Sequence, residues 1–303
     1  MKKFTTLAFI GGFSMVAGAA MSASVTIDDF TAGGQIASAA TNVGDPTPQK
    51  DGNTILVGNV LGGSRGLAVI TNPARVTGTP TDINNASLEV DPTSSATDIV
   101  TGNTVTGIIS FNNNSNQTST GVLVYSGAGA SVVEPDIQDT TPADNLADFT
   151  VDTTAPFSPT PTAAELGITT FGLNADITGG NSANNRFFFD VLSADLNVNI
   201  GIYGYDTAGN LAAAYGEDLI GGFSEYAAFN EFTYFGGYNT NFWSSTALGA
   251  LAFVVQNDPL SPVDAVLGSI SVVPLPASAL LLLGGLGGLG FMSGAKRRRR
   301  KVA

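Results

Sequence analysis

The stretch Leu196-Asn-Val-Asn-Ile-Gly-Ile-Tyr-Gly-Tyr205 decides the fold that we expect for this chain. Its apolar residues Val198, Ile200 and Ile202 recur at every second position, with asparagine or glycine between them. A period of two places alternate side chains on opposite faces of a β-strand. We therefore predict a half-buried strand here, with its apolar face against a core.

The residues that follow predict a hairpin. Asp206-Thr-Ala-Gly-Asn210 contains small residues that tolerate left-handed backbone, and Leu211 to Tyr215 then returns as the partner strand. Other short runs of β-branched or aromatic residues are also bounded by turn residues, which is typical of strands. These runs lie at 25–30, 54–60, 66–71, 104–111, 121–125, 186–192, 227–235, 246–256 and 263–272.

Short strands spread over about 250 residues are typical of a single all-β domain. We predict one β-sandwich at residues 24–271. A stretch rich in Pro, Thr and Asp at 134–162 leaves a two-domain alternative open, because it fits either a linker or a long loop that crosses between sheets.

The composition excludes several kinds of site. The chain has 12 Lys and Arg, 25 Asp and Glu, no His and no Cys. It therefore lacks the residues for a disulfide, a Cys/His zinc site or a Ser/His or Cys/His nucleophile pair. Four basic and 25 acidic residues lie between the charged ends, a formal charge of −21. We expect no nucleic-acid partner, because this charge repels a phosphate backbone.

Residues 1–23 have the three parts of a secretory signal peptide. Two lysines at the start are followed by an apolar segment at 4–16 and by small residues at 17–23. We predict export through the Sec translocon; the alternative is a short buried helix.

The C-terminus predicts one transmembrane helix. Leu275 to Ala295 carries no charge, and about 20 residues are enough to cross roughly 30 Å of hydrocarbon. The basic tail that follows orients the preceding domain outward, because basic residues stay on the cytoplasmic side. This tail consists of Lys296, Arg297, Arg298, Arg299, Arg300 and Lys301.

The motif Val273-Pro274-Leu275-Pro276-Ala277, the apolar span and the basic tail together resemble the VPLPA-CTERM form of the PEP-CTERM sorting signal. The resemblance covers residues 272–303. It implies that a membrane transpeptidase, an exosortase, processes the chain near the motif and sends the product to the cell surface or the extracellular matrix. The motif residues are then substrate residues. The chemistry agrees, because the two prolines break a helix and favour extended backbone that a protease can bind.

A second resemblance covers most of the mature chain. Ile27-Asp-Asp-Phe30, Leu61-Gly-Gly-Ser-Arg-Gly66, Asn185-Arg-Phe-Phe-Phe-Asp190 and Tyr205-Asp-Thr-Ala-Gly-Asn210 occur in an order similar to that of a group of exported PEP-CTERM proteins. These proteins have jelly-roll-like domains. The resemblance therefore implies a jelly-roll-like sandwich and supplies no reaction.

Eight aromatic residues crowd the segment 226–243. Tyr238 and Trp243 are flanked by Gly and Asn and form the candidate exposed pair of a glycan-binding platform, whereas we expect Phe229 and Phe232 to be buried. The alternative is core packing of the whole group, since aromatic side chains contribute large buried areas.

Carboxylates in turns can supply oxygen ligands for a structural calcium ion. Asp28 and Asp29 form the candidate site, with solvated turn carboxylates as the alternative, and we expect no other cofactor. Because cations are scarce, Arg65 and Arg186 are expected to pair with carboxylates.

We therefore predict an exported structural or interaction protein, anchored briefly in the inner membrane and then resident at the cell surface or in the matrix. The alternative is a carbohydrate-binding module for extracellular polysaccharide. We expect no enzymatic activity. A glycoside hydrolase is the third alternative, because it needs two carboxylates and no histidine, but no pattern selects such a pair.

Overall fold

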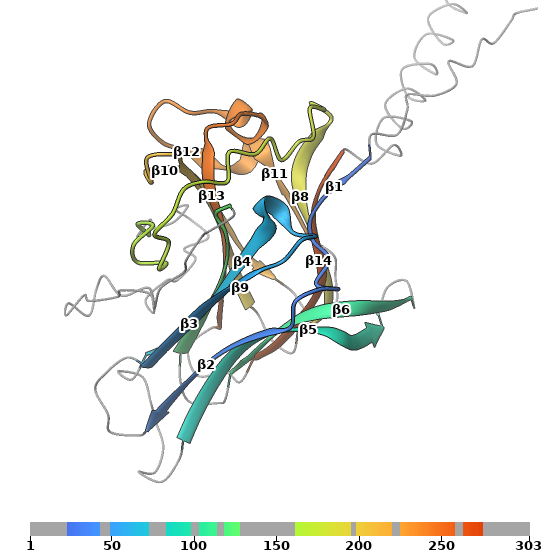
Figure 1. Cartoon of the computed structure of the whole chain (residues 1–303), viewed down its shortest axis with the longest axis vertical. Helices are drawn as coiled ribbons and strands as arrows, with labels where there is room; N and C mark the ends of the chain where they lie inside the picture. The colour runs from blue at the N-terminus through green and yellow to red at the C-terminus, as the bar shows by residue number, and fades with distance from the viewer. Residues whose placement is uncertain are drawn as a thin grey trace, which may run out of the picture. The chain divides into compact units, whose positions relative to one another are not determined.

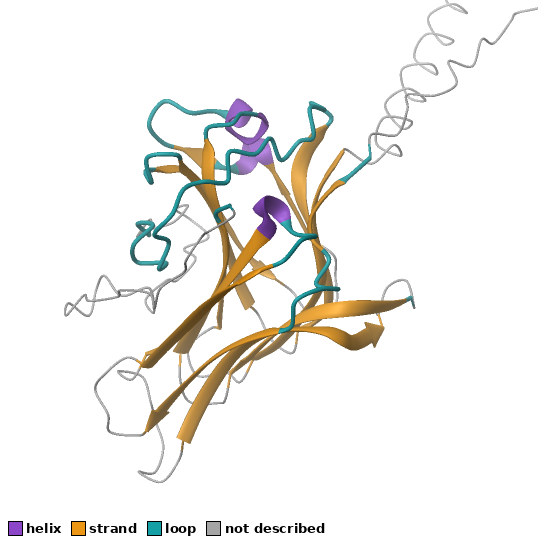
Figure 2. Cartoon of the chain, in the orientation of Figure 1, coloured by secondary structure: helices purple, strands orange, loops and turns teal. Residues whose placement is uncertain are grey.

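The computed structural model describes residues 23–42, 49–72, 83–97, 103–113, 118–127, 161–194, 198–219, 225–257 and 263–274. Residues Ser24–Leu275 form one compact unit. Strands dominate the described residues, with short 3₁₀ helices at η1 (Leu61–Gly63), η4 (Phe229–Glu231) and η5 (Thr240–Ser244) (Figure 2). No helix among them is long and apolar enough to cross a membrane, and the predicted span at 275–295 lies outside the described residues.

The strands form two antiparallel sheets, as expected for an all-β sandwich (Figure 1). Sheet A has the order β11 (Glu225–Ala228), β8 (Asn184–Ala194), β14 (Val263–Pro274), β6 (Thr104–Asn113), β5 (Ile83–Thr97) and β2 (Gln35–Asn42), and β1 (Val25–Asp28) also pairs with β14. Sheet B has the order β12 (Thr233–Tyr234), β10 (Leu211–Leu219), β9 (Val198–Asp206), β13 (Leu248–Asn257), β7 (Thr118–Tyr125), β4 (Ser64–Asn72) and β3 (Gln49–Leu56).

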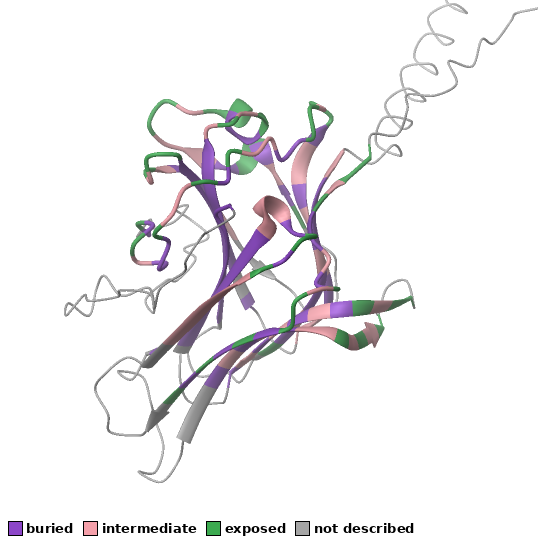
Figure 3. Cartoon of the chain, viewed as in Figure 1, coloured by how far each residue is buried: buried purple, intermediate pink, exposed green. Residues whose placement is uncertain are grey.

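The core lies between the two sheets, because alternate side chains of each strand point into that space. Along β6, Ile109 and Phe111 are buried, while Ile108 and Ser110, which alternate with them, are half-buried. On β8, Phe187 is fully buried at ring-centroid distances of 5.2 to 5.8 Å from four other aromatic rings. The residues that pack between the sheets are accordingly apolar, and the strands that carry them include many buried positions (Figure 3).

The predicted hairpin is confirmed as β9 and β10, but β9 is buried on both faces rather than on one. Ile200 and Ile202 lie in the main core, whereas Tyr203 and Tyr205 belong to a second apolar cluster on the outer face of sheet B. That cluster includes Ala163, Leu166 and Ile168, and the Tyr205 hydroxyl donates to the Pro161 carbonyl at 2.8 Å. The prediction of a half-buried strand was wrong because a segment distant in sequence covers this face.

Most of the other predicted strands are present, and two were missed. β2 and β5 contain many polar or small residues, and β5 is interrupted at Asp91 to Ser95 by a bulge that contains Pro92. The run at 227–235 is divided between β11, η4 and β12. The run at 54–60 ends earlier than expected, because the chain turns into η1 after β3.

Side chains close the gap between the edge strands β2 and β3. The Ser38 amide donates to the Asp51 carboxylate at 2.9 Å, and the Asn53 side-chain amide donates to the Ile36 carbonyl. The Gln35 side-chain amide in turn donates to the Asn53 carbonyl at 3.0 Å. Backbone groups at the edge of sheet A are therefore partly satisfied by side chains of sheet B, which reduces the tendency of an open edge to pair with another chain.

We predict that Phe187→Ala lowers the free energy of unfolding by about 3 to 5 kcal/mol, because it empties the centre of the aromatic core. Its neighbour Phe188 points to the opposite face and is half-buried, so Phe188→Ala is the matched control with an expected loss of about 1 to 2 kcal/mol. Urea unfolding of the two variants measures both values. Equal losses would contradict the strand orientation described above.

Candidate functional site

The predicted glycan platform of Tyr238 and Trp243 is not present as a pair of exposed rings. Trp243 is fully buried and packs edge-on against Phe187 at 5.2 Å. Its indole N–H donates to the Tyr234 hydroxyl at 2.9 Å. The Tyr234 hydroxyl in turn donates to the Phe229 carbonyl at 2.6 Å. The assignment of Trp243 to the surface was wrong because its ring fills the space between the sheets beside β11 and β12.

Several other aromatic residues of this stretch also serve packing. Phe229 and Phe232 are buried, as predicted. Tyr238 is half-buried with its ring 5.1 Å from that of Phe242, and its hydroxyl donates to Asp206 at 3.3 Å. Tyr238 therefore supports the turn between β9 and β10 and has no exposed partner ring in Trp243.

An exposed aromatic group lies instead on the outer face of sheet A. Tyr226 of β11 is 43% exposed and stands opposite Phe188 of β8, with the ring centroids 5.1 Å apart. The Arg186 guanidinium lies 5.5 Å from the centre of the Tyr226 ring, within the range of a cation–π contact. We call Tyr226, Phe188 and Arg186 the Tyr226 surface.

Neighbouring strands extend this surface with hydroxyl groups. Ser271 of β14 is opposite Phe188, and Thr26 of β1 is opposite Ser271. Thr26 is exposed, whereas Ser271 is buried. One row across the sheet therefore runs from an exposed aromatic ring to an exposed hydroxyl, an arrangement that combines apolar contact with hydrogen bonding.

Among the described residues Arg186 has no carboxylate partner, so our expectation for this residue is not met within them. Its Nε is buried and has no hydrogen-bond partner among them. β8 places Arg186 opposite Ala228 on one side and Val273 on the other. Neither neighbour offers an acceptor side chain, so the guanidinium contacts the Tyr226 ring instead.

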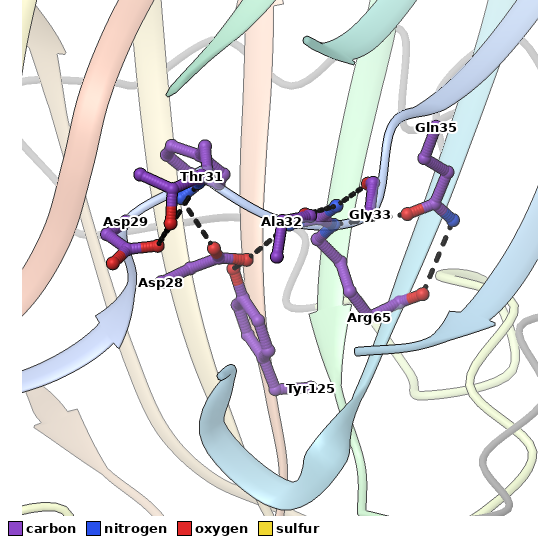
Figure 4. Close-up of polar contacts among 9 residues, drawn as sticks. Asp28, Asp29, Thr31, Ala32, Gly33, Gln35, Arg65 and Tyr125 are labelled. Atoms are coloured by element: carbon purple, nitrogen blue, oxygen red, sulfur yellow. Dashed lines mark hydrogen bonds and ion pairs between the residues drawn. The ribbon is translucent and has the colours of Figure 1, made fainter. Parts of the chain in front are cut away.

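Arg65 does pair as predicted, and its partner is Asp28, one of the two candidate calcium ligands. The Asp28 carboxylate lies 2.8 Å from Arg65 Nη1, and both side chains are buried. Asp28 also accepts from the Tyr125 hydroxyl at 2.9 Å and from the Phe30 amide at 2.8 Å (Figure 4). Arg65 Nε donates to the Gln35 side chain at 3.1 Å.

A calcium ion at Asp28 and Asp29 is therefore not supported, because the guanidinium occupies the cation position. Asp29 accepts from the amide and hydroxyl of Thr31 at 3.1 and 2.7 Å and takes no part in the ion pair. Among the described residues no group of three or more acidic side chains is placed to hold a metal. Burial raises the pKa of Asp28, and the Arg65 guanidinium opposes that effect.

A glycine turn leads the chain to Arg65. Gly62 and Gly63 have φ of 73° and 77°, in the left-handed region that favours glycine. A Cβ at Gly62 would lie 2.6 Å from a methyl group of Leu173. This turn forms η1 and is followed by β4, whose second residue is Arg65.

The sorting motif begins inside the sandwich. Val273 and Pro274 are the last residues of β14 and pair with Arg186 and Asn184 of β8. The remaining motif residues Leu275 to Ala277, the basic tail 296–301 and the signal peptide up to residue 22 lie outside the described residues.

Comparison with known proteins supplies no family. No protein-family model matches the chain, and no curated protein matches it in sequence. Among solved structures, the chain is similar to the family 11 carbohydrate-binding module of the cellulosomal cellulase Lic26A-Cel5E of Clostridium thermocellum. The TM-score is 0.30 and the identity 8%, over 84% of this chain and 95% of that chain. A likeness of this size identifies neither a fold nor a ligand.

We predict that Arg65→Met lowers the free energy of unfolding at neutral pH by about 3 to 5 kcal/mol, because it leaves the buried Asp28 carboxylate without its cation. The double variant Asp28→Asn with Arg65→Met should recover part of this loss. Without Arg65 the pKa of Asp28 rises further, so the folded state binds the proton more tightly than the unfolded state does. The loss relative to the native protein should therefore shrink as the pH falls from about 8 to about 4.

Urea unfolding at each pH measures these differences. The double variant is the control, since it has no carboxylate at position 28 and should show little of this pH dependence. A loss in the single variant that stays constant with pH would exclude an uncompensated Asp28 as its cause.

Proposed function

We propose that this protein is an exported β-sandwich that binds extracellular polysaccharide through the Tyr226 surface. The observation that carries the proposal is the exposed Tyr226 ring, held by Phe188 and Arg186 on the outer face of sheet A. Sugars stack on such rings, because their C–H groups carry a partial positive charge and the face of an aromatic ring is electron-rich.

The position of the ring on the sheet favours binding of an extended ligand. Phe188 and Arg186 limit the motion of Tyr226, so little side-chain entropy is lost when a ligand binds. The exposed Thr26 hydroxyl lies further along the same row of residues. A chain of sugars that follows this row would contact the aromatic ring and then a hydrogen-bonding group.

We propose a binding protein rather than an enzyme. Asp28 and Asp206 are the most deeply buried carboxylates among the described residues. Asp28 is neutralised by Arg65, and Asp206 accepts from the amides of Ala208 and Asn210 in the hairpin turn. Despite the opposing effect of burial, these hydrogen bonds lower the pKa of Asp206, so it is poorly suited to act as a general acid.

We further propose that residues 1–23 direct export through the Sec translocon and that residues 272–303 are a sorting signal for an exosortase. The described sandwich supports this proposal, because β1 begins at Val25 and β14 ends at Pro274, next to the two signals. Val25 pairs with Val272, so the described residues nearest to the two signals lie on neighbouring strands. After transient anchoring in the inner membrane, the product would reside at the cell surface or in the matrix.

The proposed sandwich is jelly-roll-like. Successive strands change sheet repeatedly, since β6 and β8 belong to sheet A whereas β7 and β9 belong to sheet B. This winding is compatible with two sheets wrapped from one folded ribbon, as in a jelly roll.

We predict that Tyr226→Ala weakens binding to polysaccharide extracted from the matrix of the producing cells by roughly 30-fold, or about 2 kcal/mol, because an exposed aromatic anchor is lost. Affinity gel electrophoresis of the full chain in detergent measures the change. The control is Tyr238→Ala, which removes a tyrosine near the β9–β10 turn and should leave binding unchanged. If Tyr238→Ala abolished binding and Tyr226→Ala did not, the proposed surface would be wrong.

For sorting, we expect the native protein from its host to have an intact mass that lacks both the signal peptide and the basic tail. The product should lie in the surface or matrix fraction only when the transpeptidase is present. Pro276→Ala, which changes the motif outside β14, should leave the uncut form in the inner membrane. A wild-type product that retains residues 296–303 would contradict processing and leave the tail as an anchor.

A further inference from the structure

We propose that the Tyr226 surface recognises an acidic sugar, a uronate whose carboxylate accepts hydrogen bonds from Arg186 while its ring packs against Tyr226. This inference rests on the proposed glycan-binding function and names the class of sugar. It assigns Arg186 as the residue that determines specificity and Tyr226 as the residue that supplies contact area.

The first reason is that Arg186 has no carboxylate partner among the described residues. Between the charged ends the chain carries four basic and 25 acidic residues, so carboxylates are abundant. Arg65 takes one of them at 2.8 Å, yet no described carboxylate pairs with Arg186. Its Nε is buried without a partner among the described residues. No described side chain therefore balances the charge of this guanidinium, and a ligand carboxylate would balance it through hydrogen bonds from the Nη groups.

The geometry at Tyr226 is the second reason. The guanidinium lies 5.5 Å from the centre of the ring. A pyranuronate carries its carboxylate on C5, one bond outside the sugar ring. A single residue of the ligand can therefore place its ring on Tyr226 and direct its carboxylate toward Arg186. The planar guanidinium then presents parallel N–H groups that match the two carboxylate oxygens.

The charge of the whole domain favours a carboxylate over a phosphate. The interior of the chain has a formal charge of −21, so its field repels anions, and the repulsion grows with the charge of the ligand. A uronate carries one negative charge per sugar, whereas a phosphate monoester carries up to two. The same field opposes a polyuronate, so the attraction has to come from the local cation at Arg186, and one charge per sugar keeps the opposing repulsion smaller than two charges would.

The test compares two ligands with the same sugar chain, one with charged carboxylates and one with neutral methyl esters. The probes are oligogalacturonate and the same oligosaccharide with its carboxylates methyl-esterified, titrated calorimetrically into the purified full chain in detergent at low salt. The native chain should bind oligogalacturonate more tightly than the ester. Arg186→Gln should weaken binding of oligogalacturonate by tenfold to a hundredfold, roughly the range for a hydrogen bond to a charged group, and change binding of the ester less than about threefold.

Two further variants separate the effects. Lys50→Gln removes the same charge from β3 of the opposite sheet and should leave both affinities unchanged, which controls for net charge. Tyr226→Ala should weaken both ligands alike, because it removes the stacking surface. Circular dichroism of each variant confirms that the sandwich is folded.

The outcomes distinguish the two proposals. The acidic-sugar inference would be overturned if the native chain bound both probes with equal affinity and Arg186→Gln had no selective effect. Glycan binding would still stand in that case if Tyr226→Ala weakened the binding of both probes. Failure of the native chain to bind either probe would overturn the acidic-sugar inference. If matrix polysaccharide also failed to bind, the proposed function would fall as well.

Discussion

The buried ion pair between Asp28 and Arg65 is the interaction on which the rest of the structure depends. Asp28 ends β1 of sheet A, and Arg65 lies in β4 of sheet B, so one contact of 2.8 Å joins the two sheets and fixes the N-terminal strand. Tyr125 and Gln35 supply further hydrogen bonds to the pair, so its polar atoms are largely satisfied without water. Either charge alone would be costly in this interior. The pair therefore requires the two sheets to pack so that Asp28 and Arg65 meet.

The two sheets differ in what covers them, and that difference places the candidate site. The central strands of sheet B are buried on both faces, since residues 161–168 pack on their outer side. Sheet A has its inner face in the core, and Tyr226 is exposed on its outer face. Aromatic residues between β11 and β12 fill one edge of the sandwich, so the exposed ring stands beside a rigid core. Among the described residues, Tyr226 is therefore accessible without movement of a core side chain.

Several sequence expectations were correct because they rest on local physics. The alternation at Val198, Ile200 and Ile202 predicted a strand with those residues in the core, and the small residues at 206–210 predicted its turn. The scarcity of cations suggested a structural role for Arg65, which the ion pair with Asp28 confirms. The expectations for Asp28 and Trp243 failed, since each depends on a partner far along the chain.

The local sequence by itself determined the all-β class, most of the strands and the burial of Phe229 and Phe232. These features depend on the alternation and the size of side chains within a few residues. Only the tertiary structure decided that β11 pairs with β8, which brings Tyr226 to Phe188 and Arg186. It also placed Trp243 in the core and Arg65 beside Asp28. Strand pairing between distant segments depends on the summed packing of both sheets, and no short stretch of sequence carries that information.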